Sequence, residues 1–242
     1  MPKVSIIIPA FNEALLIAET LRSIRAATPA FARRGWETEL IVCDNNSSDA
    51  TADLARNGGA TVVFEPVNQI ARARNTGAAA AAGDWLIFVD ADSQPSAELF
   101  NDVAEQIAAG RCLAGGCTVR LESGYFVSSL LIRLWNAISR TFHLMAGSFI
   151  FCEAAAFRRV GGFPNELYAG EEIELSKRLK KLARETGRRI VILRRHPLLT
   201  SARKMRLYTA GEHARFFLRT VLARGRNLDS REACHLWYDG RR

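Results

Sequence analysis

Two aspartates follow a strongly apolar segment in the first half of the 242-residue chain. Asp90 and Asp92 come directly after residues 85–89 (Trp-Leu-Ile-Phe-Val), which predict a buried strand. Ligands of open α/β sheets gather at the carboxyl ends of strands, and residues i and i+2 of an extended chain point to the same side. The pair therefore predicts two carboxylate ligands for Mg²⁺ or Mn²⁺, bound together with a diphosphate. Such aspartates also cap turns or helices, so the pair alone does not establish a metal site.

A second acidic pair, Glu171 and Glu172, follows Gly170 at the start of a helix expected over 171–184. A carboxylate beside an alcohol can act as a general base, which is the functional interpretation of this pair. Glu171 shares one helical stripe with Leu175, so it is expected to face inward, and either glutamate remains a candidate for the base. The alternative is that both acids only stabilise a helix N-terminus, by about 0.3–1 kcal/mol each.

Strands and helices alternate through the segments that carry these residues. Strands are expected over 4–8, 39–43, 61–64 and 85–89, and helices are expected from Asn12, after residue 48, over 69–82 and over 96–109. This order predicts an α/β fold with a mostly parallel, nucleotide-binding sheet flanked by helices. Dinucleotide-binding, Walker A and nucleophile-elbow motifs are absent from the sequence, which argues against dehydrogenases, P-loop enzymes and α/β-hydrolases.

The second half begins with an unusual apolar segment, residues 125–145. It has about the length of a membrane span, but Arg133 and Arg140 argue against spanning. A helix lying in a membrane interface, a helix covering an acceptor groove and an ordinary core-packing helix all remain possible. Further strands are expected over 118–122, 148–152 and 189–193.

Charge is distributed unevenly along the chain. The net charge of +8 combines −6 before Lys177 with +14 from Lys177 onward, and a basic amphipathic helix is expected over residues 204–224. Such basic segments suit an anionic partner, although most single arginines are solvated surface groups. The five cysteines are scattered and odd in number, which favours reduced thiols in a cytoplasmic protein. The N-terminal apolar run is too short for a secretory signal.

Five segments in a fixed order make residues 3–204 resemble the family 2 glycosyltransferases, which have the GT-A fold. They are 4–13 (Val-Ser-Ile-Ile-Ile-Pro-Ala-Phe-Asn-Glu), 39–51 around Asp44, 73–77 (Ala-Arg-Asn-Thr-Gly) with Gly83-Asp84, 88–92 (Phe-Val-Asp-Ala-Asp), and 161–163 with 170–175. The family usually has Glu-Asp where this chain has Glu171-Glu172, and many members have Gly-Lys before the third segment, where this chain has 68–70 (Asn-Gln-Ile).

The resemblance implies a metal-dependent, inverting transfer of a sugar from a nucleotide-diphospho-sugar to an acceptor hydroxyl. It implies Glu172 as the base, with Glu171 as the alternative, and Mg²⁺ or Mn²⁺ held by Asp92, Asp90 and His196, although a histidine in this context is more often structural. The donor, for which the family most often uses UDP- or GDP-sugars, is expected to contact Pro9, Phe11, Glu13, Asp44, Arg74, Asp90, Ala91, Arg203 and Lys204.

The expected organisation is one domain over 1–203, with a donor-binding half (1–116) and an acceptor-side half (117–203), followed by a tail over 204–242. The basic second half and residues 125–145 suggest a lipid-linked acceptor and peripheral contact with the inner face of the membrane. Two alternatives are a sugar-phosphate nucleotidyltransferase, which would need a Gly-rich basic loop after the first strand, and a non-catalytic nucleotide- or membrane-binding module. Nucleic-acid binding is not expected, because no recognition module accompanies the basic charge.

Overall fold

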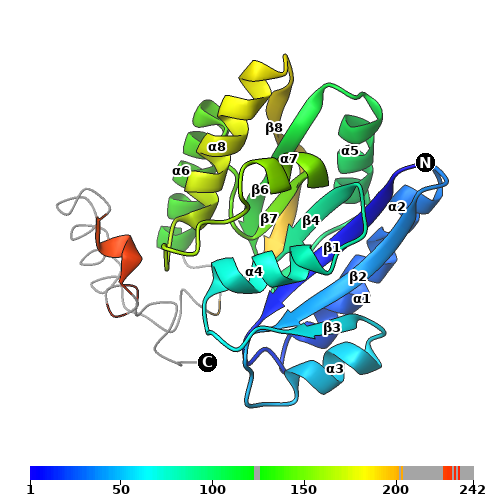
Figure 1. Ribbon diagram of the computed structural model, residues 1–242, viewed down its shortest axis with the longest axis vertical. Helices are drawn as coiled ribbons and strands as arrows, with labels where there is room; N and C mark the ends of the chain where they lie inside the picture. Colours follow the sequence, from blue (N-terminus) through cyan, green and yellow to red (C-terminus); the bar gives the residue numbers. More distant parts are fainter. Residues whose placement is uncertain (123–125, 202, 204–225, 231, 233, 235–242) are drawn as a thin grey trace.

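One mixed sheet of eight strands forms the centre of the molecule (Figure 1). The computed structural model describes residues 1–122, 126–201, 203, 226–230, 232 and 234. The strand order is β3-β2-β1-β4-β7-β6-β8-β5. The strands are β1 (Lys3–Ala10), β2 (Glu37–Asp44), β3 (Thr61–Phe64), β4 (Trp85–Val89), β5 (Ser93–Gln94), β6 (Cys112–Leu121), β7 (Phe149–Glu153) and β8 (Arg189–Thr200).

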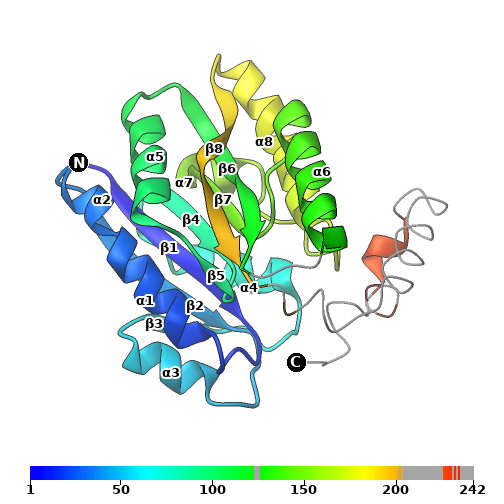
Figure 2. The same cartoon turned by 180° about the vertical axis from the view of Figure 1, so that it is seen from behind.

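Helices cover both faces of this sheet (Figures 1 and 2). They are α1 (Ile17–Ala27), α2 (Pro29–Ala32), α3 (Thr51–Asn57), α4 (Ile70–Ala79), α5 (Ala97–Ala108), α6 (Phe126–Phe142), α7 (Ala154–Arg159) and α8 (Glu171–Glu185), with a 3-10 turn at Arg226–Asp229. The α1, α2 and α5 helices lie on one face, and α4, α7 and α8 lie on the other. The predicted α/β architecture is confirmed.

Parallel pairing dominates the first half of the sheet, as predicted. β1 pairs in parallel with β2 and β4, and β2 pairs in parallel with β3. The antiparallel strand β7 then joins β4 to β6, which pairs in parallel with β8. Residue 116, where the two expected halves meet, lies inside β6, so one continuous sheet contains both halves.

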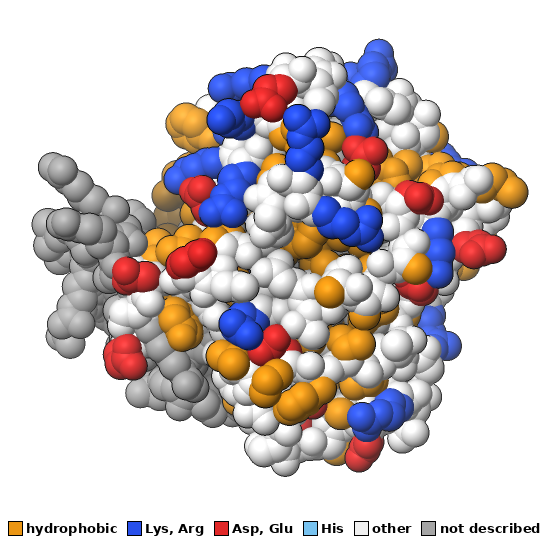
Figure 3. Space-filling view, viewed as in Figure 1, with side chains coloured by type: hydrophobic (Ala, Val, Ile, Leu, Met, Phe, Trp, Pro, Cys, Tyr) orange, Lys and Arg blue, Asp and Glu red, His pale blue; other side chains and the backbone are white. Residues whose placement is uncertain are grey.

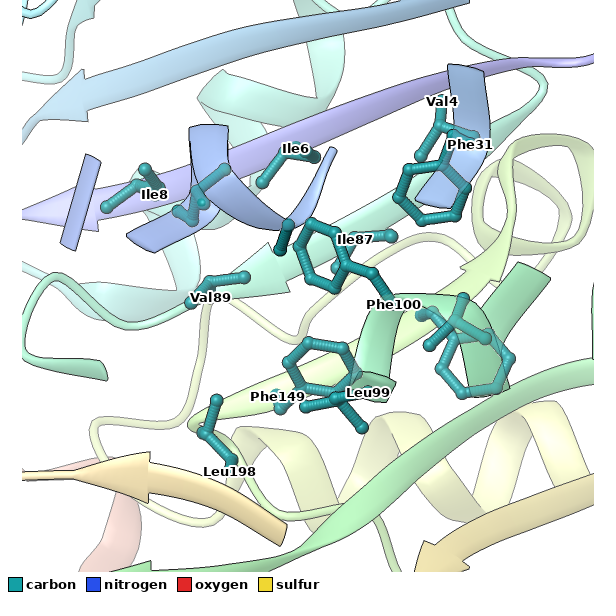
Figure 4. Packing of buried hydrophobic residues seen from close by; sticks show 14 of the residues in the cluster. Val4, Ile6, Ile8, Phe31, Ile87, Val89, Leu99, Phe100, Phe149 and Leu198 are labelled. Carbon is teal, nitrogen blue, oxygen red and sulfur yellow. The ribbon is translucent and has the colours of Figure 1, made fainter. Parts of the chain in front are cut away.

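The central strands are apolar on both sides because each side is covered by helices. In β1, Ile6 and Ile8 face one core and Ile7 faces the other. Figure 4 shows the first core, where the Phe31, Phe100 and Phe149 rings gather between helices and strands. Such a run of buried residues on both faces is what made β1 and β4 recognisable as strands in the sequence.

Several elements differ from the sequence expectation. α1 begins at Ile17 rather than at Asn12, because Asn12 takes a left-handed conformation (φ 52°) and lies in a loop. The last strand continues to Thr200 instead of ending at residue 193, and α2, α7 and β5 were not predicted. Among the described residues, no helix has the length and apolar character needed to cross a membrane. The basic helix expected over 204–224 lies outside the described residues.

Gly77 lets α4 pack directly against β1. A Cβ atom at this position would lie 2.5 Å from Cγ2 of Ile7, which is fully buried and β-branched. The Ile7 side chain has little freedom to move away, since its χ1 is restricted and its surroundings are closely packed. Glycine at residue 77 therefore sets the depth at which α4, with Arg74 one turn earlier, sits on the sheet.

We predict that Gly77→Ala lowers the free energy of unfolding by about 1–3 kcal/mol through overpacking. Helix propensity alone predicts the opposite sign, a gain of about 1 kcal/mol, so the direction of the change is decisive. Urea denaturation of both forms measures it. Ala79→Gly, at the exposed last residue of the same helix, is the control for an Ala–Gly exchange without a packing change. A Gly77→Ala variant more stable than wild type would contradict the close packing.

Candidate active site

The buried guanidinium of Arg74 joins three segments that are far apart in the sequence. Its Nη1 donates to Oε1 of Glu171 at 2.6 Å, and its Nη2 donates to Oδ1 of Asp90 at 2.9 Å and to the carbonyl of Gly147 at 2.8 Å. The guanidinium carbon also lies 5.1 Å from the ring centroid of Phe163. One positive charge thus holds the end of β4 against the start of α8.

Arg74 lies behind the site rather than at its surface. Its side chain is 2% exposed, and both terminal nitrogens have protein partners. This placement differs from the direct donor contact expected from the sequence. The two carboxylates raise the pKa of Arg74 against the opposing effect of burial, so the group stays charged.

The two glutamates of α8 have different environments because they project from different sides of its first turn. Gly170 precedes the helix in a left-handed conformation (φ 76°), which a residue without Cβ adopts without strain, and the helix begins at once with Glu171. Glu171 is buried, as its helical stripe predicted, and it is paired with Arg74, which was not predicted. Glu172 is only partly buried. The carboxylate of Glu171 is therefore committed to the ion pair, and that of Glu172 is not.

Glu172 lies against the backbone of Gly147. A Cβ atom on Gly147 would be 3.6 Å from the Cδ atom of Glu172 and 3.3 Å from Nη2 of Arg74. Removal from water is the main cause that raises the pKa of Glu172 to about 8, and the negative charge of Glu171 is the second. A carboxyl group with a pKa near neutrality, at the edge of a polar site, has the properties of a general acid or base.

Asp90 and Asp92 follow β4 in a turn, not in an extended strand. The N–H of Ser93 donates to the Asp90 carbonyl at 3.1 Å, which closes the turn. The prediction assumed an extended strand through Asp92, but the strand ends at Val89, so strand alternation does not determine the directions of the two carboxylates. Asp92 is buried, and its carbonyl accepts from the N–H of Ser201 at 3.0 Å. Ala91, between them, is also buried.

His196 lies elsewhere. Its Nδ1 atom is 3.0 Å from Oδ2 of Asp102 on α5. The sequence-based expectation that His196 joins Asp90 and Asp92 is therefore not met. The register of β6 and β8 shifts just before this point, with Cys117 opposite Leu193 but Val119 opposite Leu198. Among the described residues, no group of three or more His, Cys, Asp or Glu side chains could hold a metal by itself.

Hydrogen bonds connect the loops that follow β1 and β2 at the same edge of the sheet. Asp44 ends β2, is buried, and accepts from the N–H of Ser47 at 3.1 Å. Oδ1 of Asn12 accepts from the N–H of Ser48 at 2.8 Å, and the backbone N–H of Asn12 donates to Ser47 Oγ at 3.0 Å. Pro9, within β1, is buried and Phe11, just after it, is partly buried. These contacts form the edge on which the predicted donor contacts of the first half lie.

Glu13 and Arg203, predicted separately as donor contacts, form an ion pair across the site. The backbone N–H of Glu13 also donates to Thr51 Oγ1 at 2.8 Å, which holds the Glu13 backbone at the start of α3. The Nε atom of Arg203 is buried and has no hydrogen-bond partner in the described part of the chain. That N–H could be satisfied by an anionic ligand. Lys204, the last predicted contact, lies outside the described residues.

Two other polar residues of the α4 region connect the halves of the molecule, and sequence reasoning gave them no role. The Gln69 amide donates to the carbonyls of Asn165 and Leu167 at 2.7 and 2.9 Å. The Asn75 amide donates to the Phe163 carbonyl and accepts from its N–H, at 2.8 and 3.0 Å. Asn75 belongs to the Ala-Arg-Asn-Thr-Gly segment, so that segment was the available signal. Gly147 had none.

Residues 5–161 match the family model described as "Glycosyl transferase family 2". The curated protein "Glycosyltransferase AglE" from Haloferax volcanii is 28% identical over 194 residues, which are 74% of this chain and 61% of that protein. "Uncharacterized glycosyltransferase Mb0553" from Mycobacterium bovis is 33% identical over 113 residues, 47% of each chain. The chain therefore spans less than two thirds of the length of these relatives.

Solved structures show the same fold. The mannosyltransferase PcManGT from Pyrobaculum calidifontis, "in complex with GDP-Man and Mn2+", has a TM-score of 0.69 at 23% identity, covering 90% of this chain and 61% of that one. S. aureus TarS 1–349, "in complex with UDP-GlcNAc", has a TM-score of 0.66 at 21% identity, with coverages of 97% and 69%. The expected GT-A fold is confirmed.

The raised pKa of Glu172 predicts a pH dependence of stability. The folded state retains this proton at pH values where the unfolded chain, with an ordinary pKa near 4.5, has released it. The stabilisation is complete below the unfolded pKa and is lost as the pH rises through the folded pKa of about 8. We therefore expect the free energy of unfolding of wild type, relative to Glu172→Gln, to fall between about pH 5 and pH 8, by at most about 1.4 kcal/mol per unit.

Chemical denaturation across this pH range measures the difference. Glu174→Gln controls for the loss of a carboxylate from the first turn of α8, because Glu174 faces Lys177 and Arg178 instead of the site. A difference between wild type and Glu172→Gln that stays constant or grows with pH would contradict the assigned environment of Glu172.

Proposed function

This chain belongs to glycosyl transferase family 2, and we propose that it transfers a sugar from a nucleotide-diphospho-sugar to an acceptor hydroxyl, with a divalent cation and with inversion at the sugar carbon. The observation that carries the proposal is the Arg74 ion-pair cluster. It keeps the acidic turn after β4 beside a second acidic pair on α8. A transferase needs these two functions side by side: charge control at the leaving diphosphate and a base at the attacking alcohol.

Glu172 is the proposed base. Its carboxylate removes the proton of the acceptor hydroxyl while the hydroxyl oxygen forms a bond to the sugar carbon. The bond from that carbon to the diphosphate oxygen breaks, and its electron pair leaves with the nucleoside diphosphate. Attack from the side opposite the leaving group inverts the configuration. Partial exposure and a raised pKa support Glu172, whereas the carboxylate of Glu171 is already occupied by Arg74.

Asp92 and Asp90 are the proposed protein ligands of Mg²⁺ or Mn²⁺. No third protein ligand is needed, because Mg²⁺ is usually bound by one or two carboxylates together with substrate phosphates and water. This agrees with the described residues, where no group of three or more such side chains occurs. When bound, the cation would neutralise negative charge on the departing diphosphate. Arg74 fixes one oxygen of Asp90 and so orients this carboxylate. His196 is not part of the proposed set.

The donor is proposed to bind along the edge formed by the loops after β1 and β2. Asp44 would accept hydrogen bonds from the nucleotide, beside Phe11, and Arg203 would donate to its phosphates. UDP- and GDP-sugars are the proposed donors, supported by the GDP-Man and UDP-GlcNAc complexes of proteins with this fold. We propose that Arg74 positions Asp90 and Glu171 and does not contact the donor.

We expect this chain to release nucleoside diphosphate from one member of a panel of UDP-, GDP- and dTDP-sugars, and to need Mn²⁺ or Mg²⁺. Asp92→Asn should weaken Mn²⁺ binding measured in the presence of the nucleoside diphosphate and lower turnover at least about 100-fold. Glu172→Gln should lower kcat by about 100- to 10,000-fold with donor affinity retained, since it removes only proton transfer. Coupled detection of nucleoside diphosphate and donor titration measure these effects.

Glu174→Gln is the matched control, because it removes a carboxylate two residues along the same helix turn and away from Gly147. Full activity of Glu172→Gln together with an inactive Glu171→Gln would move the base by one residue. No turnover with any donor or metal, in protein shown to be folded, would count against the enzyme proposal as a whole.

The pH profile of kcat/KM separates the two glutamates. A base acts only when deprotonated, so kcat/KM should rise with pH and level off above the pKa of Glu172 in the free enzyme, about 8. The negative charge of Glu171 contributes to this raised pKa, so Glu171→Gln should move the rising limb to lower pH. An unmoved limb in Glu171→Gln would show that another group controls the profile.

A further inference from the structure

α6 leaves four large apolar side chains exposed, which is unusual for a helix of a globular protein. Leu130, Leu131, Leu134 and Phe142 are 56%, 49%, 57% and 59% exposed. A helix packed on a protein core normally turns such residues inward and its polar residues outward. Here Ile132, Trp135 and Ile138 are partly buried, but the four residues above remain largely exposed. The outward surface of α6 (these four residues) is therefore an exposed apolar face.

One polar side chain attaches α6 to the sheet, and another bonds the loop that follows the helix. The Asn136 amide donates to the Val119 carbonyl at 2.9 Å and accepts from the Val119 N–H at 3.0 Å. Ser139 is buried and donates to the Leu144 carbonyl at 2.6 Å. The two bonds between Asn136 and Val119 on β6 fix the rotation of α6 about its axis, and they therefore also fix the outward direction of its leucines.

Positive charge borders the apolar face. Arg133 and Arg140 are exposed, lie seven residues apart on one side of α6, and have no acidic residue on the same helix to balance them. The neighbouring helix α8 adds exposed Lys181 and Arg184, and Lys180 bonds the Phe142 carbonyl at the end of α6. Figure 3, seen from the side of α8, shows Lys and Arg side chains around this helix with acidic side chains among them.

We propose that the outward face of α6 docks on a membrane surface that contains anionic lipid. Exposed leucines with a phenylalanine, bordered by arginines, are the composition of helices that lie in the plane of a bilayer interface. A cavity of about 490 Å³ between α6 and the end of β6 supports this occupant. It is lined by the apolar residues Val119, Leu121 and Ile132 and by the basic residues Arg120 and Arg133. The apolar residues suit the acyl chain of a lipid, and the arginines suit its phosphate group.

The docked face would place the membrane close to the proposed base. Only residues 143–146 separate the end of α6 from Gly147, where an added Cβ atom would lie 3.6 Å from Cδ of Glu172. Within this segment, the N–H of Met145 donates to Oγ of Ser176, and this hydroxyl donates to the Glu172 carbonyl. If the proposed glycosyl transfer is correct, on which this consequence rests, the acceptor hydroxyl belongs to a molecule held at the bilayer surface.

Flotation of the full chain with phosphatidylcholine vesicles, with and without phosphatidylglycerol, tests the proposal. We expect binding at low salt to the anionic vesicles, and a fall of about tenfold or more in the partition coefficient for Leu130→Ser/Leu134→Ser, because two apolar side chains no longer enter the interface. Arg133→Ser/Arg140→Ser should lose most of the preference for anionic lipid. Phe64→Ser is the matched control, since Phe64 is 58% exposed at the opposite edge of the sheet, and it should float like wild type.

Three results would overturn the proposal. Equal flotation of wild type and Leu130→Ser/Leu134→Ser would assign lipid binding to charge elsewhere in the basic second half. No flotation of a protein that still releases nucleoside diphosphate would remove the membrane contact and leave the enzyme proposal intact. A dimer in analytical ultracentrifugation that Leu130→Ser/Leu134→Ser converts to monomer, without flotation, would assign the face to a second copy of the chain.

Discussion

A single buried charge organises this molecule. The Arg74 guanidinium is enclosed by protein, and a charge in such a place must be paired, because removing one partner of a buried pair costs about 3–5 kcal/mol. Its partners come from β4 and α8, which are 81 residues apart, so folding cannot satisfy Arg74 without bringing the two acidic segments together. The same requirement also separates the roles of Glu171 and Glu172: one carboxylate neutralises Arg74, and the other remains with a raised pKa at the edge of the site.

α4, which carries Arg74, connects this buried charge to the rest of the fold. Gly77 seats the helix against β1, and Gln69 and Asn75 bond the backbone of the loop that leads to α8. The proposed donor-binding edge and the loop that leads to α8 are therefore fixed to one short helix. The outward face of α6 joins the same assembly through residues 143–147, so membrane contact and chemistry would share one rigid frame.

Sequence reasoning succeeded where local pattern determines structure. Apolar runs predicted the central strands, a helical stripe predicted that Glu171 faces inward, and the order of motifs predicted the family and fold. It failed where contacts between distant segments decide. His196, for example, pairs with Asp102 across 94 residues. The early end of the strand at Val89 is a separate, local difference, because a turn from Asp90 to Ser93 follows it. Neither the partners of Arg74 nor the role of Gly147 has a local signature, because each depends on packing between remote elements.

The most direct test is a crystal structure with Mn²⁺ and the nucleoside diphosphate of the active donor. The account predicts the cation between the diphosphate and the carboxylates of Asp92 and Asp90, with Arg74 still bonded to Asp90 and Glu171, and with Glu172 facing the place of the sugar. A diphosphate bound directly by Arg74 after release from its carboxylates, or a cation held away from Asp90 and Asp92, would contradict it.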